Sequence, residues 1–137
     1  MTSRTGGALI GYVTLGTNDV NRAAAFYDVV LAEIGAKRSR EQAKYIGWQI
    51  APGQPQLLLI DPYDGNGAST GNGVMVGLRA GTPERVRAAY EKAVALGGKD
   101  EGPPGLRNDP PGFYVAYVRD LDGNKLAFYC TSIVPTL

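Results

Sequence analysis

The residues that most often carry out enzymatic chemistry are scarce in this chain of 137 residues. It has no histidine and a single cysteine, Cys130, so it lacks both the commonest general base and the commonest transition-metal ligand. The side chains left for acid–base work are the carboxylates and eight tyrosines. A phenol has a pKa of about 10, so a tyrosine acts as a base near neutral pH only where its surroundings lower that pKa strongly.

The thirteen carboxylates do not follow a metal-ligand pattern. They fall on predicted helices or in loops, turns and strand ends, and none lies within a strand expected to line a site. Asp120 and Asp122 before Gly123 fit either a calcium loop or an ordinary turn, and turns favour these residues in any case. Cys130 has no basic partner nearby in the sequence, which favours a buried structural thiol over a nucleophile.

The overall composition is typical of one compact domain, with 44% hydrophobic and 20% charged residues. The formal net charge of +1 provides no field for nucleic acid or anionic lipid, so we expect neither nucleic acid nor membrane as a partner. No apolar run approaches the roughly 18 residues of a membrane span, and residues 1–7 lack the apolar centre of a signal peptide. With a lone cysteine, this favours a cytoplasmic protein without disulfides.

The elements that must position any site occur twice. A strand at residues 8–15 precedes a helix that Asn18 or Asp19 caps and Gly35 ends, and a strand at 74–80 precedes a helix from Thr82. Further strands are predicted at residues 36–38, 44–50 and 56–60 in the first copy and at 99–101, 113–119 and 125–130 in the second. The chain is therefore one domain made of module 8–63 and module 74–131.

Two long segments remain outside these elements. The glycine-rich segment 64–73 is predicted to be the linker between the modules, since it enters a strand and a phosphate-binding loop enters a helix. Segment 102–112 holds four prolines and is predicted to be a loop, either a lid over a pocket or a surface excursion.

Three segments carry a resemblance to a known family. They are Tyr12–Leu15 with the following helix, Gly71–Leu78, and Asp120–Leu126. In this order they resemble the vicinal oxygen chelate superfamily, which includes glyoxalase I-type lyases, extradiol dioxygenases, fosfomycin-resistance enzymes and bleomycin-resistance proteins. The resemblance implies an α+β fold in which two tandem βαβββ modules form a cupped mixed β-sheet.

The resemblance also implies where a metal site belongs. In this family the concave face of the sheet holds a divalent metal, bound by histidine, glutamine or glutamate from the first and last strands of each module. Those positions correspond here to Tyr12, Leu58, Met75 and Ala127. A neutral tyrosine and a soft thioether bind hard cations poorly, and leucine and alanine have no donor atom. We therefore expect no metal and no other cofactor.

Side chains on the same face provide the other site candidates. Strand alternation places Tyr12 and Met75 on the concave face, and a similarity to the extradiol dioxygenase signature adds Tyr117, the one catalytic candidate. Arg79 and Arg107 are expected at the rim. The predicted ligand-binding residues are Tyr12, Met75, Arg79, Tyr117, Ala127 and Tyr129. These side chains either line an open aromatic pocket or fill the concave face as ordinary packing, and the sequence leaves both interpretations open.

Four functions compete on this evidence. The favoured one is a metal-free protein that binds an aromatic or antibiotic-like small molecule. The alternatives are a metal-dependent lyase or dioxygenase of glyoxalase type, a metal-independent enzyme with a pocket tyrosine as its acid, and an interaction subunit without a ligand. Because members of the family commonly pair, the resemblance also predicts a homodimer.

Overall fold

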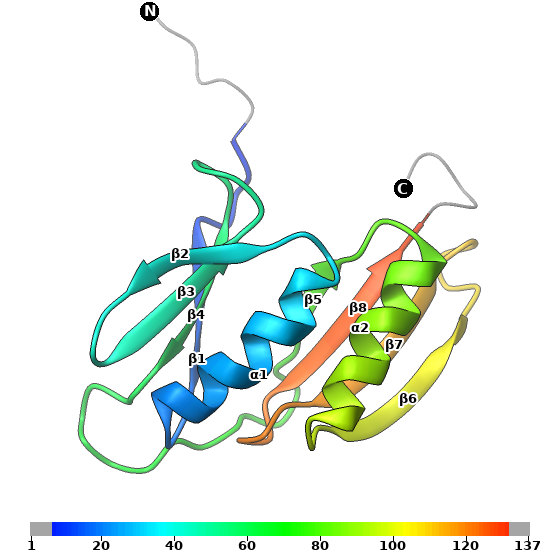
Figure 1. The fold of residues 1–137 in the computed structure, drawn as a ribbon. Helices are drawn as coiled ribbons and strands as arrows, with labels where there is room; N and C mark the ends of the chain where they lie inside the picture. The colour runs from blue at the N-terminus through cyan, green and yellow to red at the C-terminus, as the bar shows by residue number, and fades with distance from the viewer. Residues whose placement is uncertain (1–6, 132–137) are drawn as a thin grey trace, which may run out of the picture.

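The computed structural model describes residues 7–131, which form two copies of a βαβββ module (Figure 1). The first copy contains β1 (Tyr12–Gly16), α1 (Val20–Ala32), β2 (Lys37–Glu41), β3 (Tyr45–Gln49) and β4 (Gln56–Ile60). The second contains β5 (Val76–Arg79), α2 (Pro83–Ala95), β6 (Lys99–Leu106), β7 (Tyr114–Arg119) and β8 (Lys125–Cys130). The predicted α+β fold with two tandem modules is confirmed. Among the described residues, no helix has the length and apolar character needed to cross a membrane.

Each module has its own four-stranded mixed sheet. The strand orders are β1-β4-β3-β2 and β5-β8-β7-β6. In both sheets the first strand runs parallel to the last, and the other pairs are antiparallel. The two sheets therefore have the same topology, as expected for a duplicated module, and β1 and β5 are outer strands.

The helix ends follow the capping signals in the sequence. The Asp19 side chain accepts a hydrogen bond from the backbone N–H of Arg22 at 3.0 Å and so is the cap that the sequence left undecided. Thr82 caps α2 in the same way, with Pro83 at the first helical position. Gly35 and Gly97 follow the helices with positive φ angles of 88° and 103°, which glycine adopts without strain.

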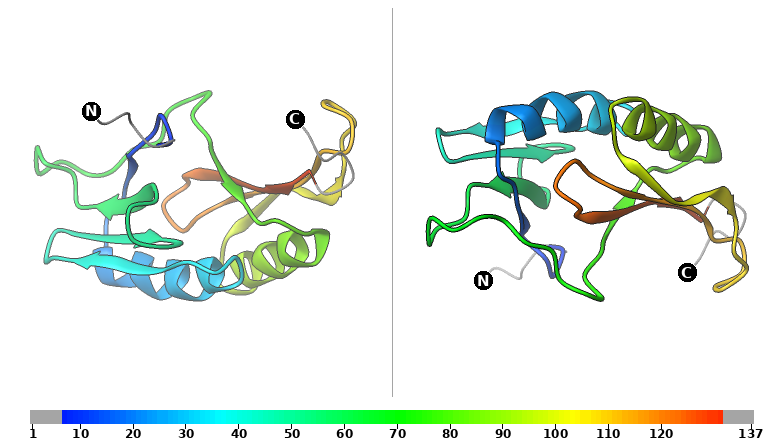
Figure 2. Two further views of the ribbon diagram at one scale, coloured as in Figure 1. Left: turned by 90° about the horizontal axis from the view of Figure 1, so that it is seen from above. Right: turned by 90° about the horizontal axis from the view of Figure 1, so that it is seen from below.

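Both helices lie on the same side of the molecule. Figure 2 shows α1 and α2 side by side, each covering one face of its sheet. The core lies between helices and sheets, where Trp48 and Tyr27 are almost completely buried. The Trp48 indole donates to Asp28 on α1 at 3.0 Å, so Tyr45, three residues earlier on β3, faces the other way. We call the face of each sheet that carries no helix its open face.

Some predicted boundaries are wrong, and the main error concerns β6. Segment 102–112 was expected to be a loop, but β6 continues to Leu106. Two irregularities in its pairing with β7, at Asp100/Gly102 and Gly102/Gly105, accommodate the glycines. Since β6 is an outer strand, its prolines do not interrupt a central hydrogen-bonded ladder. At the other end, β1 begins only at Tyr12, not at residue 8.

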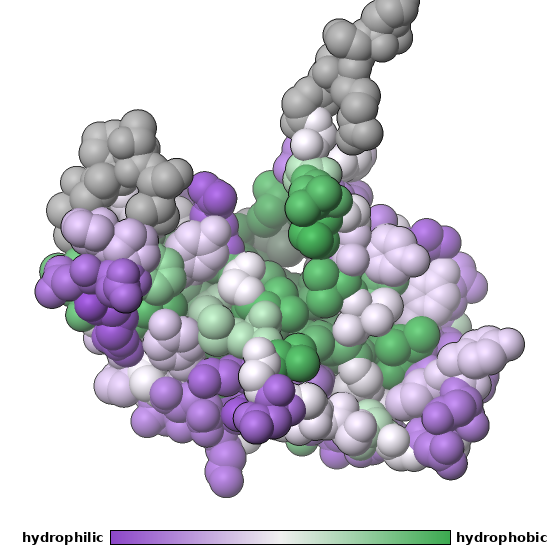
Figure 3. All heavy atoms as spheres, turned by 180° about the vertical axis from the view of Figure 1, so that it is seen from behind, coloured by the Kyte–Doolittle hydropathy of each residue, from purple (hydrophilic) through white to green (hydrophobic). Residues whose placement is uncertain are grey.

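Hydrophobic residues are exposed on the side of the molecule that carries the open faces (Figure 3). Seen from the side away from the helices, hydrophobic residues gather in the middle of the surface, with hydrophilic ones towards its borders (Figure 3). Exposed large hydrophobic residues occur on and before the outer strands: Leu9, Ile10, Tyr12, Val74 and Met75. This side therefore offers apolar surface to a ligand or a partner.

Candidate functional site

The open face of the first sheet contains a cavity of about 310 Å³. It is lined by Tyr12, Thr14, Arg40, Tyr45, Gln56, Leu58 and Ile60. We call it the β1–β4 pocket. Strands β1 and β4 provide most of its wall because Thr14 and Leu58 are paired in register and so point to the same side. The volume falls at the lower end of the range for small-molecule sites, which fits a ligand of one or two rings.

The polar groups of this pocket are three hydroxyls, which both donate and accept hydrogen bonds, together with Arg40 and Gln56. The Arg40 guanidinium lies 5.5 Å from the centroid of the Tyr45 ring, within range of a cation–π contact. The Ser39 hydroxyl donates to Oε1 of Gln56 at 2.7 Å. With its acceptor oxygen occupied in this way, Gln56 offers its amide N–H groups to the pocket. Among residues 7–131, no carboxylate lines the cavity.

The open face of the second sheet carries the other predicted site residues. Tyr117 pairs with Ala127 across β7 and β8, and Arg79 pairs with Tyr129 across β5 and β8. Cations accompany both rings: Arg79 lies 5.7 Å from the centroid of Tyr129, and Lys125 lies 5.4 Å from that of Tyr117. Arg107 lies 5.7 Å from the Tyr117 centroid as well.

The structure does not gather the predicted site residues in one cavity. Tyr12 lines the β1–β4 pocket, whereas Tyr117 and Tyr129 belong to the second sheet. Met75 precedes β5 and is 46% exposed, while Ala127 is 2% exposed. The pocket residues that sequence reasoning missed are Arg40, Tyr45, Gln56 and Ile60. Alternation along β4 was the available signal, since Gln56, Leu58 and Ile60 are two residues apart.

The residues present do not fit the metal site that the resemblance implies. Tyr12 and Leu58 lie together in the β1–β4 pocket, but they offer one neutral phenol and no second donor. Ala127 is buried and has no donor atom. Within residues 7–131, no three His, Cys, Asp or Glu side chains cluster closely enough to hold a metal ion. We therefore derive no chemistry from a bound metal.

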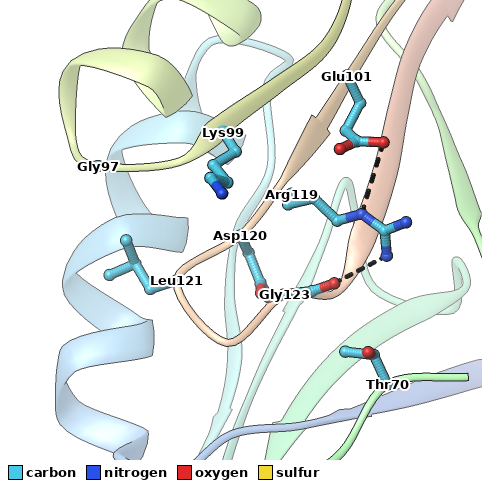
Figure 4. A pocket seen from close by; sticks show the side chains of 8 residues that line it. All are labelled: Thr70, Gly97, Lys99, Glu101, Arg119, Asp120, Leu121 and Gly123. Atoms are coloured by element: carbon cyan, nitrogen blue, oxygen red, sulfur yellow. Dashed lines mark hydrogen bonds and ion pairs between the residues drawn. The ribbon is translucent and has the colours of Figure 1, made fainter.

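A second recess lies at the junction of the second sheet with the linker. It has a volume of about 600 Å³ and is lined by Thr70, Gly97, Lys99, Glu101, Arg119, Asp120, Leu121 and Gly123. As Figure 4 shows, the Arg119 guanidinium lies between Glu101 and the carbonyl of Gly123, at 3.7 Å and 3.0 Å. No carboxylate was expected within a strand that lines a site, and this expectation is wrong, because Glu101 lies within β6 and lines the recess. Since Arg119 is already bound by the protein, this recess is the weaker ligand candidate.

The Asp120–Asp122 turn joins the two modules. The Asp122 carboxylate accepts hydrogen bonds from the Thr17 hydroxyl at 2.6 Å, the Asn18 backbone at 3.0 Å and the Arg22 guanidinium at 2.8 Å. These three donors lie in the first module, just before and within the first turn of α1. Of the two interpretations of this turn, the structural one is therefore supported, because protein donors occupy the carboxylate.

The buried phenol of Tyr27 is hydrogen-bonded to the same turn. From this contact we predict that the protein loses stability at alkaline pH. Its hydroxyl donates to Asp120 at 2.5 Å. Burial, followed by the charge of Asp120, raises the pKa of Tyr27 well above 10. Because an unfolded tyrosine ionises near pH 10, the stability that neutral Tyr27 contributes is complete below about pH 10 and is lost as the pH rises further.

Urea unfolding between pH 9 and 11 tests this prediction. The free energy of unfolding should fall more steeply with pH in the wild type than in Tyr27→Phe. Tyr63→Phe, which changes a fully exposed tyrosine, should follow the wild-type profile. Parallel profiles for wild type and Tyr27→Phe would contradict the assignment.

The sequence and the fold of this chain are similar to those of known proteins. The family model described as Glyoxalase/Bleomycin resistance protein/Dioxygenase superfamily matches residues 9–128. A solved glyoxalase/bleomycin resistance protein from Albidiferax ferrireducens T118 is 31% identical, with a TM-score of 0.82 over 90% of this chain and 98% of its own. A hypothetical protein from S. aureus is 29% identical, with a TM-score of 0.68 over 91% of this chain and 95% of its own.

More distant structures share the fold. Lactoylglutathione lyase from Agrobacterium tumefaciens is 21% identical, with a TM-score of 0.65 over 97% of this chain and 100% of its own. The search of curated proteins finds no match. Because the family model matches most of this chain, residues 9–128, the chain belongs to the glyoxalase/bleomycin resistance protein/dioxygenase superfamily.

Proposed function

We propose that this member of the superfamily binds a small organic molecule directly, without a metal ion. One observation carries the proposal. Two of the family's ligand positions, Tyr12 and Leu58, line the β1–β4 pocket, where aromatic, apolar and hydrogen-bonding groups stand in place of a metal-binding set. Such a lining suits a ligand that stacks on tyrosine rings and is oriented by a few donors.

The proposal is tested by metal content and ligand binding together. Elemental analysis of the purified protein is expected to find far less than one first-row metal per chain, and dialysis against EDTA should leave the melting temperature unchanged. A thermal-shift screen of aromatic acids, amides and antibiotics should raise the melting temperature with some compounds. One bound metal per chain, or a loss of stability with EDTA, would favour the metal-dependent lyase or dioxygenase.

We further propose that the chain acts as a homodimer that pairs through the margins of its sheets. Strands β1 and β5 are outer strands, and outer strands that are left uncovered tend to pair with another chain. The chain just before them exposes Leu9 at 97%, Val74 at 54% and Met75 at 46% of their surface. A second copy would cover these residues with the equivalent surface of its own chain.

The oligomeric state can be measured by sedimentation equilibrium. The wild type is expected at twice the mass of one chain, and Met75→Asp should shift it towards the monomer. Val94→Asp changes an exposed apolar residue on α2 and should leave the dimer intact. A monomeric wild type would contradict this part of the proposal.

A further inference from the structure

Several cations lie beside aromatic rings on the open faces of the two sheets. Two carboxylates of residues 7–131, Glu101 and Asp120, line the recess at the rim of these faces. The cations on these faces or at their rim are Arg40, Arg79, Lys99, Arg107, Arg119 and Lys125. A surface with this excess attracts anions and repels cations.

Several carboxylates are engaged in other contacts. Asp28 accepts hydrogen bonds from Nε and Nη2 of Arg38, at 2.9 and 2.7 Å, on the helix side of the first sheet. Asp120 and Asp122 are enclosed in the module junction, and Glu84 lies on α2. Arg40 is exposed, has no ion pair with a carboxylate of residues 7–131, and lies beside the ring of Tyr45.

From these observations we infer that the ligand of the β1–β4 pocket is an aromatic anion, a carboxylate or phosphonate on a one- or two-ring system. The inference rests on the proposed function and specifies its ligand class. Arg40 binds the anionic group, because a guanidinium forms charge-assisted hydrogen bonds to two oxygens of a carboxylate or phosphonate at once. The Gln56 amide donates to the same group, and Tyr12 and Tyr45 contact the ring of the ligand.

The positive charge of Arg40 makes the pocket less suited to cationic and neutral aromatic ligands than to anionic ones. A cationic aromatic molecule would approach a ring face beside which a guanidinium already lies 5.5 Å away, and it would find no carboxylate to pair with. A neutral aromatic molecule would gain no charge-assisted hydrogen bond from Arg40, which is exposed to water in its absence. Single-stranded nucleic acid also binds cations and aromatic rings, but the net charge of +1 provides little attraction for a long polyanion.

Three probes of nearly equal shape and different charge test the inference: 1-naphthoate, its neutral amide 1-naphthamide, and the cation 1-naphthylmethylamine. Titration calorimetry in low salt should give naphthoate about tenfold higher affinity than naphthamide, and the amine should bind more weakly than either. Added salt should narrow the gap between naphthoate and naphthamide, because it screens charge.

Substitutions test whether Arg40 is the residue that binds the anionic group of naphthoate. Arg40→Gln should weaken naphthoate about tenfold and change naphthamide by less than about twofold. Arg85→Gln removes the same charge from the exposed helix side and should change neither affinity. Leu58→Phe fills the pocket and should weaken both probes while the melting temperature stays close to that of the wild type.

The outcomes separate this inference from the proposed function. If naphthamide binds as tightly as naphthoate, or if Arg40→Gln leaves naphthoate unaffected, the anion assignment is overturned while metal-free binding stands. If naphthoate does not bind the folded protein at millimolar concentration, or if a single-stranded oligonucleotide displaces it at lower concentration, the assignment is overturned as well. If no probe binds and the protein contains one metal per chain, the proposed function itself fails.

Discussion

Asp120→Ala is expected to lower the free energy of unfolding by about 3–5 kcal/mol, the largest effect we expect of any single substitution in this chain. The carboxylate is nearly inaccessible, since Asp120 is 5% exposed. One oxygen accepts from the backbone N–H groups of Asp122 and Asn124, at 2.9 and 2.8 Å. The other accepts from the Tyr27 hydroxyl at 2.5 Å and from the Asn124 amide at 3.0 Å.

Removing this carboxylate leaves several buried hydrogen-bond donors without their acceptor. The Asn124 amide keeps a bond to the Gly16 carbonyl at 2.9 Å, but the Tyr27 hydroxyl loses the one acceptor described for it, deep in the core. Each buried donor without a partner costs about 1–3 kcal/mol. Since Tyr27 belongs to the first module and the turn to the second, the loss falls on the contact between modules.

Urea unfolding followed by the fluorescence of Trp48 measures this loss, because the Trp48 ring lies 5.5 Å from that of Tyr27. Asp64→Ala is the matched control: Asp64 also accepts two hydrogen bonds from a residue two positions on, but it is fully exposed in the linker. The control should stay within about 0.5 kcal/mol of the wild type. A loss below about 1 kcal/mol for Asp120→Ala would mean that the junction contributes little.

The fold could be predicted from the sequence because its signals are local and occur twice. Capping at Asp19 and Thr82, and the turn from Asp120 to Asn124, depend on residues a few positions apart. The extent of β6 could not be predicted, because its glycines and prolines are tolerated only by pairing with β7, and that contact is remote in sequence.

The site was harder to predict than the fold for a related reason. The sequence could place Tyr12 and Leu58 on one face by alternation and by family resemblance, and the structure has both in one pocket. It could not decide which of Tyr45 and Trp48 faces the core, because alternation separates two faces without saying which one a helix covers. Arg40 could not be predicted as a pocket residue from alternation. An irregularity in β2 between Arg38 and Arg40 changes the side to which the residues of the strand point.

Gly98→Ala is the second substitution with a large expected effect, a loss of about 2–4 kcal/mol in the free energy of unfolding. The reason is space, because a Cβ at this position would lie 2.8 Å from the carbonyl oxygen of Ala93 and 2.9 Å from that of Arg119. Both are backbone atoms, so no side-chain rotation relieves the contact. The Gly98 N–H also donates to Ala93 at 2.8 Å as the chain leaves α2.

Two glycine substitutions act as controls for this prediction. Gly11→Ala places its methyl group where no atom lies within 4 Å, and at Gly77 the nearest atom to a Cβ is 3.6 Å away on Tyr129. Both variants should stay within about 0.5 kcal/mol of the wild type in urea unfolding. To accommodate a methyl group at residue 98, α2 and β7 must move apart where β6 begins, which weakens the pairing of Lys99 with Arg119. Hydrogen exchange should therefore speed up at the start of β6 in Gly98→Ala, and a variant with wild-type stability and exchange would show that α2 and β7 are not closely packed there.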